Sequence, residues 1–301
     1  MAFTATKIKV EQVITERIME ALRNGTIPWR KPWGTAGLPV NLITNREYRG
    51  VNVFMLSMAG YDDPRFLTYL QAKEKGGHVR KGERSLPVLK YGEGTSKRDF
   101  DAEGNPKTYR FFLYSNVFNV SQVDGLELPS LPDVPVHTHT PIERCESVVK
   151  NMPNCPPIAW NSNRASYSPS ADAVSMPPRE RFTKTEEMYA TLFHELAHST
   201  GHKSRLNRDN FAGDLGSGSY AREELVAEMG AAFLCGHCGI ETETVENAAA
   251  YIAGWLKRLS DDPKLVIQAG SKANAASDYI LGKSGKTAEN ESELVAESAV
   301  A

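Results

Sequence analysis

The segment His194-Glu195-Leu196-Ala197-His198 has the pattern H-E-x-x-H within an apolar run that favours a helix. Residues four apart lie on one face of a helix, so both imidazoles can bind the same metal ion. Glu195 stands beside the first imidazole, where it can take a proton from water at the metal. We therefore predict a Zn²⁺-dependent hydrolase in the second half of the chain, with Glu195 as the catalytic residue.

A catalytic zinc site commonly has three protein ligands and one water, so a third ligand is needed. The acids of the next predicted helix, Glu223, Glu224 and Glu228, are the nearest candidates along the chain. We predict that Glu224 is the third ligand. Glu228, four residues later on the same face, is predicted to hydrogen-bond a ligand and so to orient it. Glu223 is expected to point to solvent.

His202 is the alternative third ligand. On a continued helix it would lie roughly 12 Å from His194, at about 1.5 Å per residue, which is too far for one ion. Gly201 could end the helix and turn His202 back, but one residue is little chain for that turn. A hydrolase also needs a donor to the oxyanion that forms during reaction. Tyr167, Tyr220 and His202 are candidates, and the sequence does not choose among them.

The elements expected around this site are mostly helical. A helix over Thr183–Thr200 carries the metal motif, with Thr183 as its N-cap and Glu186 completing a capping box. Tyr167–Met176 is expected to be an edge strand or strand pair, which could pair with an extended peptide. Further helices are expected over Pro141–Met152, Ala221–Leu234, Thr244–Leu259 and Asp262–Leu281, the last with Pro263 in its first turn.

The first half mixes helix and strand patterns, which indicates an α+β domain. A helical stripe covers Lys7–Asn24, Val51–Ala59 is a buried helix or strand, and Phe66–Lys75 is expected to be helical. Leu86–Tyr91 and Tyr109–Val120 are expected to be strands, with Ser96–Lys107 as the hairpin loop between them. A proline-rich stretch at 126–141 predicts a linker between domains at 1–125 and 142–282, and the polar tail 283–301 is expected to be disordered.

Charge and aromatic residues are distributed unevenly. Residues 1–120 carry a balance of +7 and the remainder −9, which together give the net −2. Residues 1–120 also contain 15 of the 26 aromatic residues. A basic half joined to an acidic half suggests two modules with different partners. No apolar run is long enough to cross a membrane and the first residues lack a signal-peptide core, so a cytoplasmic protein is expected.

Single-stranded nucleic acid is the partner that the basic half suits best. Aromatic rings interleaved with cations bind unstacked bases and their phosphates, whereas an intact duplex offers no base face for stacking. The alternative is that the aromatics form the core of the domain and the cations its solvated face. The predicted DNA-binding residues are Trp29, Arg30, Lys31, Trp33, Tyr48, Arg49, Arg80 and Lys81.

Both halves resemble one known family. The first half resembles the N-terminal domain of ArdC-type antirestriction proteins, which is shared with primases of conjugative plasmids, in the runs NGTIPWRKPW, GLPVNLITNREYRGVNVFML and GYDDPRFLTYLQAKEKGGHVRKGERSLPV. The second half resembles the zincin-like metallopeptidase domain of the same family, in LFHELAHSTGHKSRLNR and YAREELVAEMGAAFLC. The resemblance covers nearly the whole chain up to about Gly282.

This resemblance implies a bacterial protein that binds single-stranded DNA during conjugation and protects it from host restriction. It also implies a zinc peptidase fold with His194, His198 and Glu224 at the metal and Glu195 catalytic. A protein of the host restriction or DNA-processing machinery would be the substrate. Two alternatives stay open: a DNA-coating protein with a structural or idle metal site, and a regulatory peptidase whose basic domain binds protein.

Overall fold

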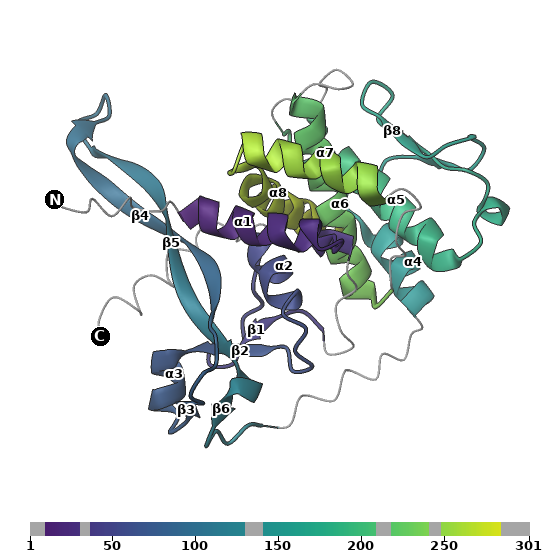
Figure 1. Ribbon diagram of the computed structural model, residues 1–301. Helices are drawn as coiled ribbons and strands as arrows, with labels where there is room; N and C mark the ends of the chain where they lie inside the picture. Colours follow the sequence, from purple (N-terminus) through teal and green to yellow (C-terminus); the bar gives the residue numbers. More distant parts are fainter. Residues whose placement is uncertain (1–9, 31–36, 130–140, 209–217, 241–247, 284–301) are drawn as a thin grey trace.

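The structure is a computed structural model that describes residues 10–30, 37–129, 141–208, 218–240 and 248–283. It is an α+β protein with two domains, as the sequence predicted. One domain holds a sheet with a long hairpin, and the other is mainly helical (Figure 1). Among the described residues, no helix combines the length and apolar character needed to cross a membrane.

The first domain is built around a four-stranded sheet of order β1-β2-β5-β4. Helix α1 packs against β4, β5 and α7, and its Ile14, Ile18 and Leu22, which are spaced four apart, are fully buried. A smaller sheet pairs β3 with β6. The elements are α1 (Val10–Arg23), η1 (Pro28–Arg30), β1 (Val40–Asn41), α2 (Val51–Ser57), β2 (Arg65–Thr68), α3 (Tyr69–Glu74), β3 (His78–Val79), β4 (Leu86–Phe100), β5 (Pro106–Asn119), η2 (Val120–Gln122) and β6 (Val123–Asp124).

The helix predicted over Phe66–Lys75 is wrong in its first three residues. Phe66 to Thr68 belong to β2, which lies between β1 and β5 and so gains backbone partners on both sides. Helix α3 then begins at Tyr69. The Thr68 side chain accepts the N–H of Gln71, and the Gln71 side chain accepts the N–H of Thr68, which is a capping box.

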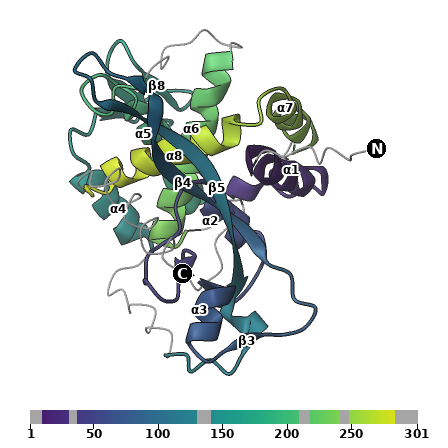
Figure 2. The same cartoon turned by 90° about the vertical axis from the view of Figure 1, so that its left-hand side faces the viewer.

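Strands β4 and β5 form an antiparallel hairpin that extends away from the body of the protein in Figure 1 and lies in front of the helices in the turned view of Figure 2. Their pairing runs from Leu86↔Val117 to Thr95↔Thr108, and after an irregularity Phe100 pairs with Pro106. The predicted loop over Ser96–Lys107 was therefore too long. The tight turn that replaces most of it closes on the Asp101 side chain, which accepts the backbone N–H groups of residues 103 and 105.

The second domain places α6 at its centre, between α5 and α8. Its three-stranded sheet has the order β7-β9-β8, which leaves β8 at an edge. The elements are α4 (Pro141–Asn151), β7 (Ile158–Ala159), β8 (Ser166–Ser168), β9 (Ala173–Ser175), η3 (Arg179–Arg181), α5 (Thr185–Ser199), α6 (Gly218–Cys238), α7 (Ala248–Asp261) and α8 (Leu265–Ile280).

Two predicted helix starts in this domain are wrong. Helix α5 has Lys184 as its N-cap, without a side-chain cap, because the Thr183 hydroxyl bonds the Glu187 carboxylate at 3.0 Å instead. Helix α8 starts at Leu265 rather than Asp262. Pro263 stays outside the helix, and its carbonyl accepts the Thr15 hydroxyl of α1 at 2.6 Å.

The largest hydrophobic core contains side chains from both halves of the chain. Phe54 of α2 stacks on Phe233 of α6, with ring centroids 5.0 Å apart. Trp29 of η1 meets Trp255 of α7 edge to face at 5.8 Å. Helix α6 is therefore held on one side by the first domain, and on the other by a second core that it shares with α5 and the three-stranded sheet.

Candidate metal centre

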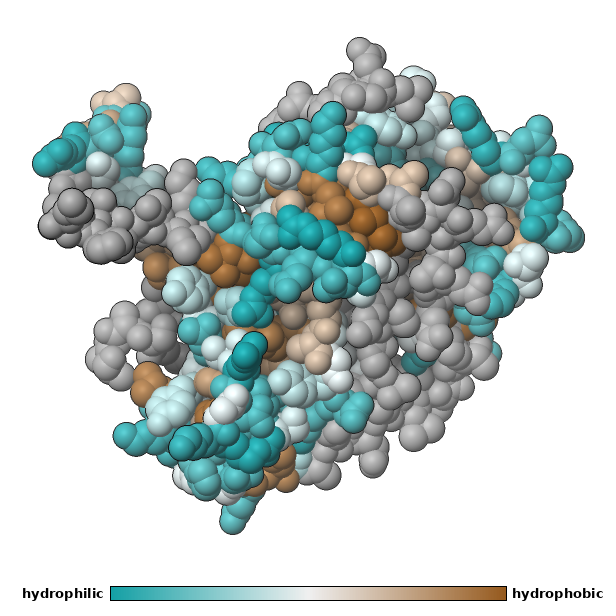
Figure 3. All heavy atoms as spheres, viewed as in Figure 1, coloured by the Kyte–Doolittle hydropathy of each residue, from teal (hydrophilic) through white to brown (hydrophobic). Residues whose placement is uncertain are grey.

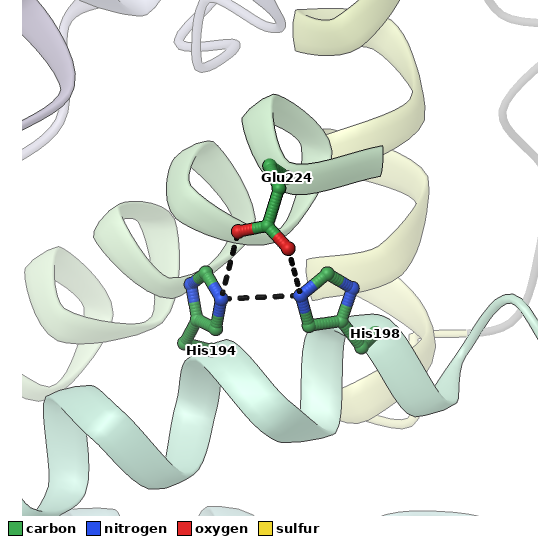
Figure 4. A group of neighbouring side chains, drawn as sticks. All are labelled: His194, His198 and Glu224. Carbon is green, nitrogen blue, oxygen red and sulfur yellow. Dashed lines mark hydrogen bonds and ion pairs between the residues drawn. The ribbon is translucent and has the colours of Figure 1, made fainter. Parts of the chain in front are cut away.

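His194 and His198 project from one face of α5 toward Glu224 of α6 (Figure 4). The two Nε2 atoms are 3.1 Å apart. The Glu224 carboxylate spans both rings, with Oε2 3.6 Å from Nε2 of His194 and Oε1 3.5 Å from Nε2 of His198. Within the described part of the chain, this is the one group of three or more potential ligands whose donor atoms converge, all within 4.8 Å of one another.

This donor set fits a divalent metal ion. Two imidazole nitrogens and one carboxylate oxygen are the ligands that catalytic zinc sites use with one position kept for water. The three side chains are 14 to 26% exposed, so the group is reachable from solvent but shielded on most sides. We therefore treat the three residues as a candidate metal centre.

The Glu224 carboxylate and the two imidazoles shift one another's pKa values. Burial favours the neutral form of the Glu224 carboxyl, but the imidazoles outweigh this effect and lower its pKa to about 2. Burial likewise disfavours the charged form of His198, yet its contacts with Glu223 and Glu224 raise its pKa to about 9. Glu224 is thus ionised near neutral pH and can bind a cation, whereas His198 must first lose a proton before it can do so.

Glu195 is placed to act as a base beside the candidate centre. Its side chain is buried, and burial is the main reason that its pKa is raised; the negative charge of Glu224 adds to this shift. The carboxylate accepts the backbone N–H of Tyr167 on the edge strand β8. This contact holds the carboxylate between α5 and the sheet.

Glu223, expected in solvent, is instead buried against the candidate centre. Its Oε1 lies 3.6 Å from Nδ1 of His198, on the opposite side of that ring from Glu224. The buried Arg208 pairs with Glu223 through Nε and Nη2 and also donates to the carbonyl of Ala197. Glu223 is therefore the carboxylate that orients His198.

Glu228, predicted for that orienting role, points elsewhere. Its carboxylate accepts the indole N–H of Trp29 at 2.9 Å and the hydroxyl of Tyr251. At about 100° per residue, Glu228 lies about 40° around the helix from Glu224, on the side of Leu225 and the shared core, whereas Glu223 lies about 100° to the other side. A spacing of four does not decide which side of a helix faces a given neighbour.

Of the candidate oxyanion donors, Tyr220 lies at the site. It hydrogen-bonds Glu224, and burial together with that contact raises its pKa to about 12, so the hydroxyl keeps its proton near neutral pH. The Tyr167 hydroxyl donates to Asp172 at 2.7 Å and also contacts Arg205. His202, the alternative ligand, lies with this second group, its Nδ1 3.5 Å from Asp172.

Those predicted DNA-binding residues whose side chains the structure describes lie in different environments. Trp29 is only 1% exposed and lies in the shared core, so it offers no face to a base. Tyr48 packs against Phe66, Arg49 pairs with Asp278, and Arg80 pairs with Glu83 and Asp124. Lys81 is exposed, whereas Lys31, Trp33 and the side chain of Arg30 lie outside the described residues.

Sequence comparisons assign a known domain to each half. Residues 8–118 match the family model described as the N-terminal domain of anti-restriction factor ArdC, and residues 144–272 match that of a zincin-like metallopeptidase. Relatives include a DNA primase TraC of Escherichia coli, 38% identical over 90% of this chain. The chain spans 20% of that primase and 26% of a second one, which is 36% identical. The protein y4eC of Sinorhizobium fredii is 33% identical over 95% of this chain and 96% of its own length.

Two crystal structures share the fold over nearly their whole length. Both are of the antirestriction ArdC protein from the R388 plasmid, which is 35% identical to this chain. The metal-free form has a TM-score of 0.73 and aligns over 92% of this chain and 98% of its own. The Mn(II)-bound form has a TM-score of 0.70, over 93% and 100%.

Proposed function

The chain belongs to the ArdC family of antirestriction proteins, and from this we propose that it binds single-stranded DNA entering during conjugation and acts there as a zinc-dependent peptidase. The observation that carries the proposal is the convergence of His194, His198 and Glu224 beside the buried Glu195. Family membership supports the antirestriction role. The Mn(II)-bound form of the R388 protein supports a divalent metal in this fold.

The proposed peptidase chemistry divides among a few side chains. A divalent metal held by the two histidines and Glu224 would supply Lewis acidity to the scissile carbonyl and to the attacking water. Glu195 accepts a proton from that water and then donates it to the leaving amine. Its raised pKa suits both steps, because the carboxylate must first bind the proton and later release it. The Tyr220 hydroxyl would transfer its hydrogen bond from Glu224 to the carbonyl oxygen as negative charge develops there.

The first domain is proposed to hold the DNA. Its excess of +7 over residues 1–120 attracts phosphates, and its aromatic content suits unpaired bases. The match to the N-terminal ArdC domain supports this assignment. The shared core then keeps the DNA-binding domain and the candidate metal centre in a fixed relation, so a protein bound to the same DNA strand is the expected peptidase substrate.

A second candidate function is strand coating without proteolysis. It is favoured by the direct contact of both domains, because a metal between α5 and α6 would stiffen the helix against which the DNA-binding domain packs. In that case the metal serves structure and Glu195 is dispensable.

A matched pair of variants on α5 separates the two candidates. Glu195→Gln removes the proposed base, and Glu186→Gln removes a carboxyl from the first turn of the same helix. For the peptidase we expect that Glu195→Gln abolishes protection of unmethylated plasmid DNA during conjugation into a restricting host, while zinc content and oligonucleotide binding stay at the level of Glu186→Gln. Full protection by Glu195→Gln would leave only the coating function.

A further inference from the structure

One side of the β4–β5 hairpin carries an exposed row of large side chains. Residues of β5 alternate between its two sides, so Lys107, Tyr109, Phe111 and Leu113 share one of them. Lys90 of β4 is paired with Leu113 and lies on the same side. These five residues are called the hairpin face.

The hairpin face becomes exposed where the hairpin leaves the body. Closer to the body, Val88 and Val117 on the same side are each 1% exposed and pack in a small core. Farther out, Leu113 is 42%, Phe111 37% and Tyr109 53% exposed. Figure 3 shows hydrophobic atoms around the foot of the hairpin and mainly hydrophilic ones near its tip. A contiguous apolar row at such a projection marks an interaction site.

Glycines on the facing strand shape this row. Gly92 is paired with Phe111 and Gly94 with Tyr109. A Cβ atom built at Gly92 would come within 2.6 Å of the Phe111 ring, and one at Gly94 within 2.8 Å of the Tyr109 ring. Each ring therefore lies across the backbone of β4, with one face covering a glycine and the other turned outward. The two ring centroids are 5.9 Å apart.

The charges along the face suit an anionic partner. Lys107 is exposed beside Tyr109, and Lys90 stands at the other end of the row. No position on this side of the paired register, from Leu86↔Val117 to Gly94↔Tyr109, is acidic. The acids of the hairpin tip, Asp99, Asp101 and Glu103, lie beyond the row. A polyanion is thus attracted to the middle of the hairpin and not to its end.

We propose that the hairpin face is the surface on which single-stranded DNA lies, with bases stacked on Tyr109 and Phe111 and phosphates beside Lys107 and Lys90. The inference rests on the proposed DNA-binding function and assigns it to residues other than the buried Trp29. Two outward aromatic faces between cations are what sequence-tolerant binding of an unpaired strand requires. A duplex does not fit, because its bases are stacked on one another.

The test compares variants of the full chain that remove rings from opposite sides of the hairpin. Tyr109→Thr and Phe111→Thr keep a residue that favours strands but delete the stacking surface. Tyr114→Thr is the matched control, because Tyr114 is 56% exposed on the other side of β5. Binding of a fluorescein-labelled oligodeoxythymidine is measured by anisotropy. We expect about tenfold weaker binding for each of the first two variants, and less than a twofold change for the control.

A second variant reports contact directly. Phe111→Trp keeps a flat ring over Gly92, and we expect its fluorescence to be quenched when the oligonucleotide is added. If the unaltered chain binds no oligonucleotide at low salt, the proposed DNA-binding function itself is wrong. If it binds, but Tyr109→Thr and Phe111→Thr bind equally well and Phe111→Trp is not quenched, the DNA lies elsewhere and only the hairpin assignment is overturned.

Discussion

Replacing Glu223 with glutamine tests the arrangement behind the candidate metal centre. Glu223 and Arg208 have side chains that are 10% and 6% exposed, and Glu223 also lies 3.6 Å from Nδ1 of His198. Glutamine keeps one oxygen that can accept a hydrogen bond but loses the negative charge, so it orients His198 less strongly, and such outer partners contribute about 10- to 100-fold to metal affinity. We therefore expect zinc to bind Glu223→Gln about 10- to 100-fold more weakly, which is a loss of about 1.4 to 2.8 kcal/mol of binding free energy.

Stability should change in the same variant. Removing one partner of a buried ion pair costs about 3–5 kcal/mol when the other charge is left without a partner. Arg208 keeps the carbonyl of Ala197, and glutamine still offers a carbonyl oxygen, so we expect a smaller loss of about 1–3 kcal/mol. Urea unfolding of the metal-free protein measures this difference.

The control is Glu228→Gln, on the same helix. Its carboxylate bonds Trp29 and Tyr251, on the side of α6 that faces the shared core. Zinc affinity, measured by competition with a chromophoric chelator, should then match that of the unaltered chain. If zinc affinity fell in Glu228→Gln and not in Glu223→Gln, the assignment of the orienting acid would be refuted.

Three further results are expected. Trp29→Phe should lower the free energy of unfolding by about 1–3 kcal/mol, because Glu228 loses a buried donor. Oligonucleotide affinity, measured by anisotropy, should stay within about twofold of the unaltered chain. A large loss of affinity would contradict the assignment of Trp29 to the core. Zinc affinity, measured by chelator competition, should rise roughly tenfold per pH unit between pH 7 and 9. The pKa of His198 is about 9 in the metal-free protein, and its proton must leave before zinc binds. An affinity that does not change with pH would contradict this role of His198. Burial opposes ionisation of Asp172, but its hydrogen bonds, of which that from Arg205 is the strongest, lower its pKa. The ionised carboxylate therefore stabilises the folded protein, and this contribution is lost as pH falls below about 3.9, the usual pKa of an aspartate. Asp172→Asn should therefore show less acid dependence of stability in urea titrations; an unchanged dependence would count against the pairing.

Local pattern was sufficient for the elements whose signal is periodic. The stripe of Ile14, Ile18 and Leu22 predicted α1, and the H-E-x-x-H spacing predicted that His194 and His198 would share a face of α5. Boundaries that depend on partners were less accurate. β2 is a strand because strands on both sides satisfy its backbone, and that context lies outside its own sequence.

The hairpin shows the same limit for a surface. The aromatic and apolar residues over Tyr109–Val120 predicted a strand, but a strand of an antiparallel sheet normally buries one side. That this row faces outward follows from the hairpin extending beyond the body, a result of packing between distant segments.

The sequence alone determined the two imidazoles of the candidate centre and the carboxylate of Glu195 beside them, because the spacing of His194, Glu195 and His198 on one helix is a local property. Only the tertiary structure decided which acids of α6 meet them. The roll of α6 about its axis is set by packing against α5 on one side and the first domain on the other, which turns Glu223 and Glu224 toward the histidines and Glu228 toward Trp29. Helix periodicity specifies the angles between residues, whereas contacts with distant segments specify the direction in which they point.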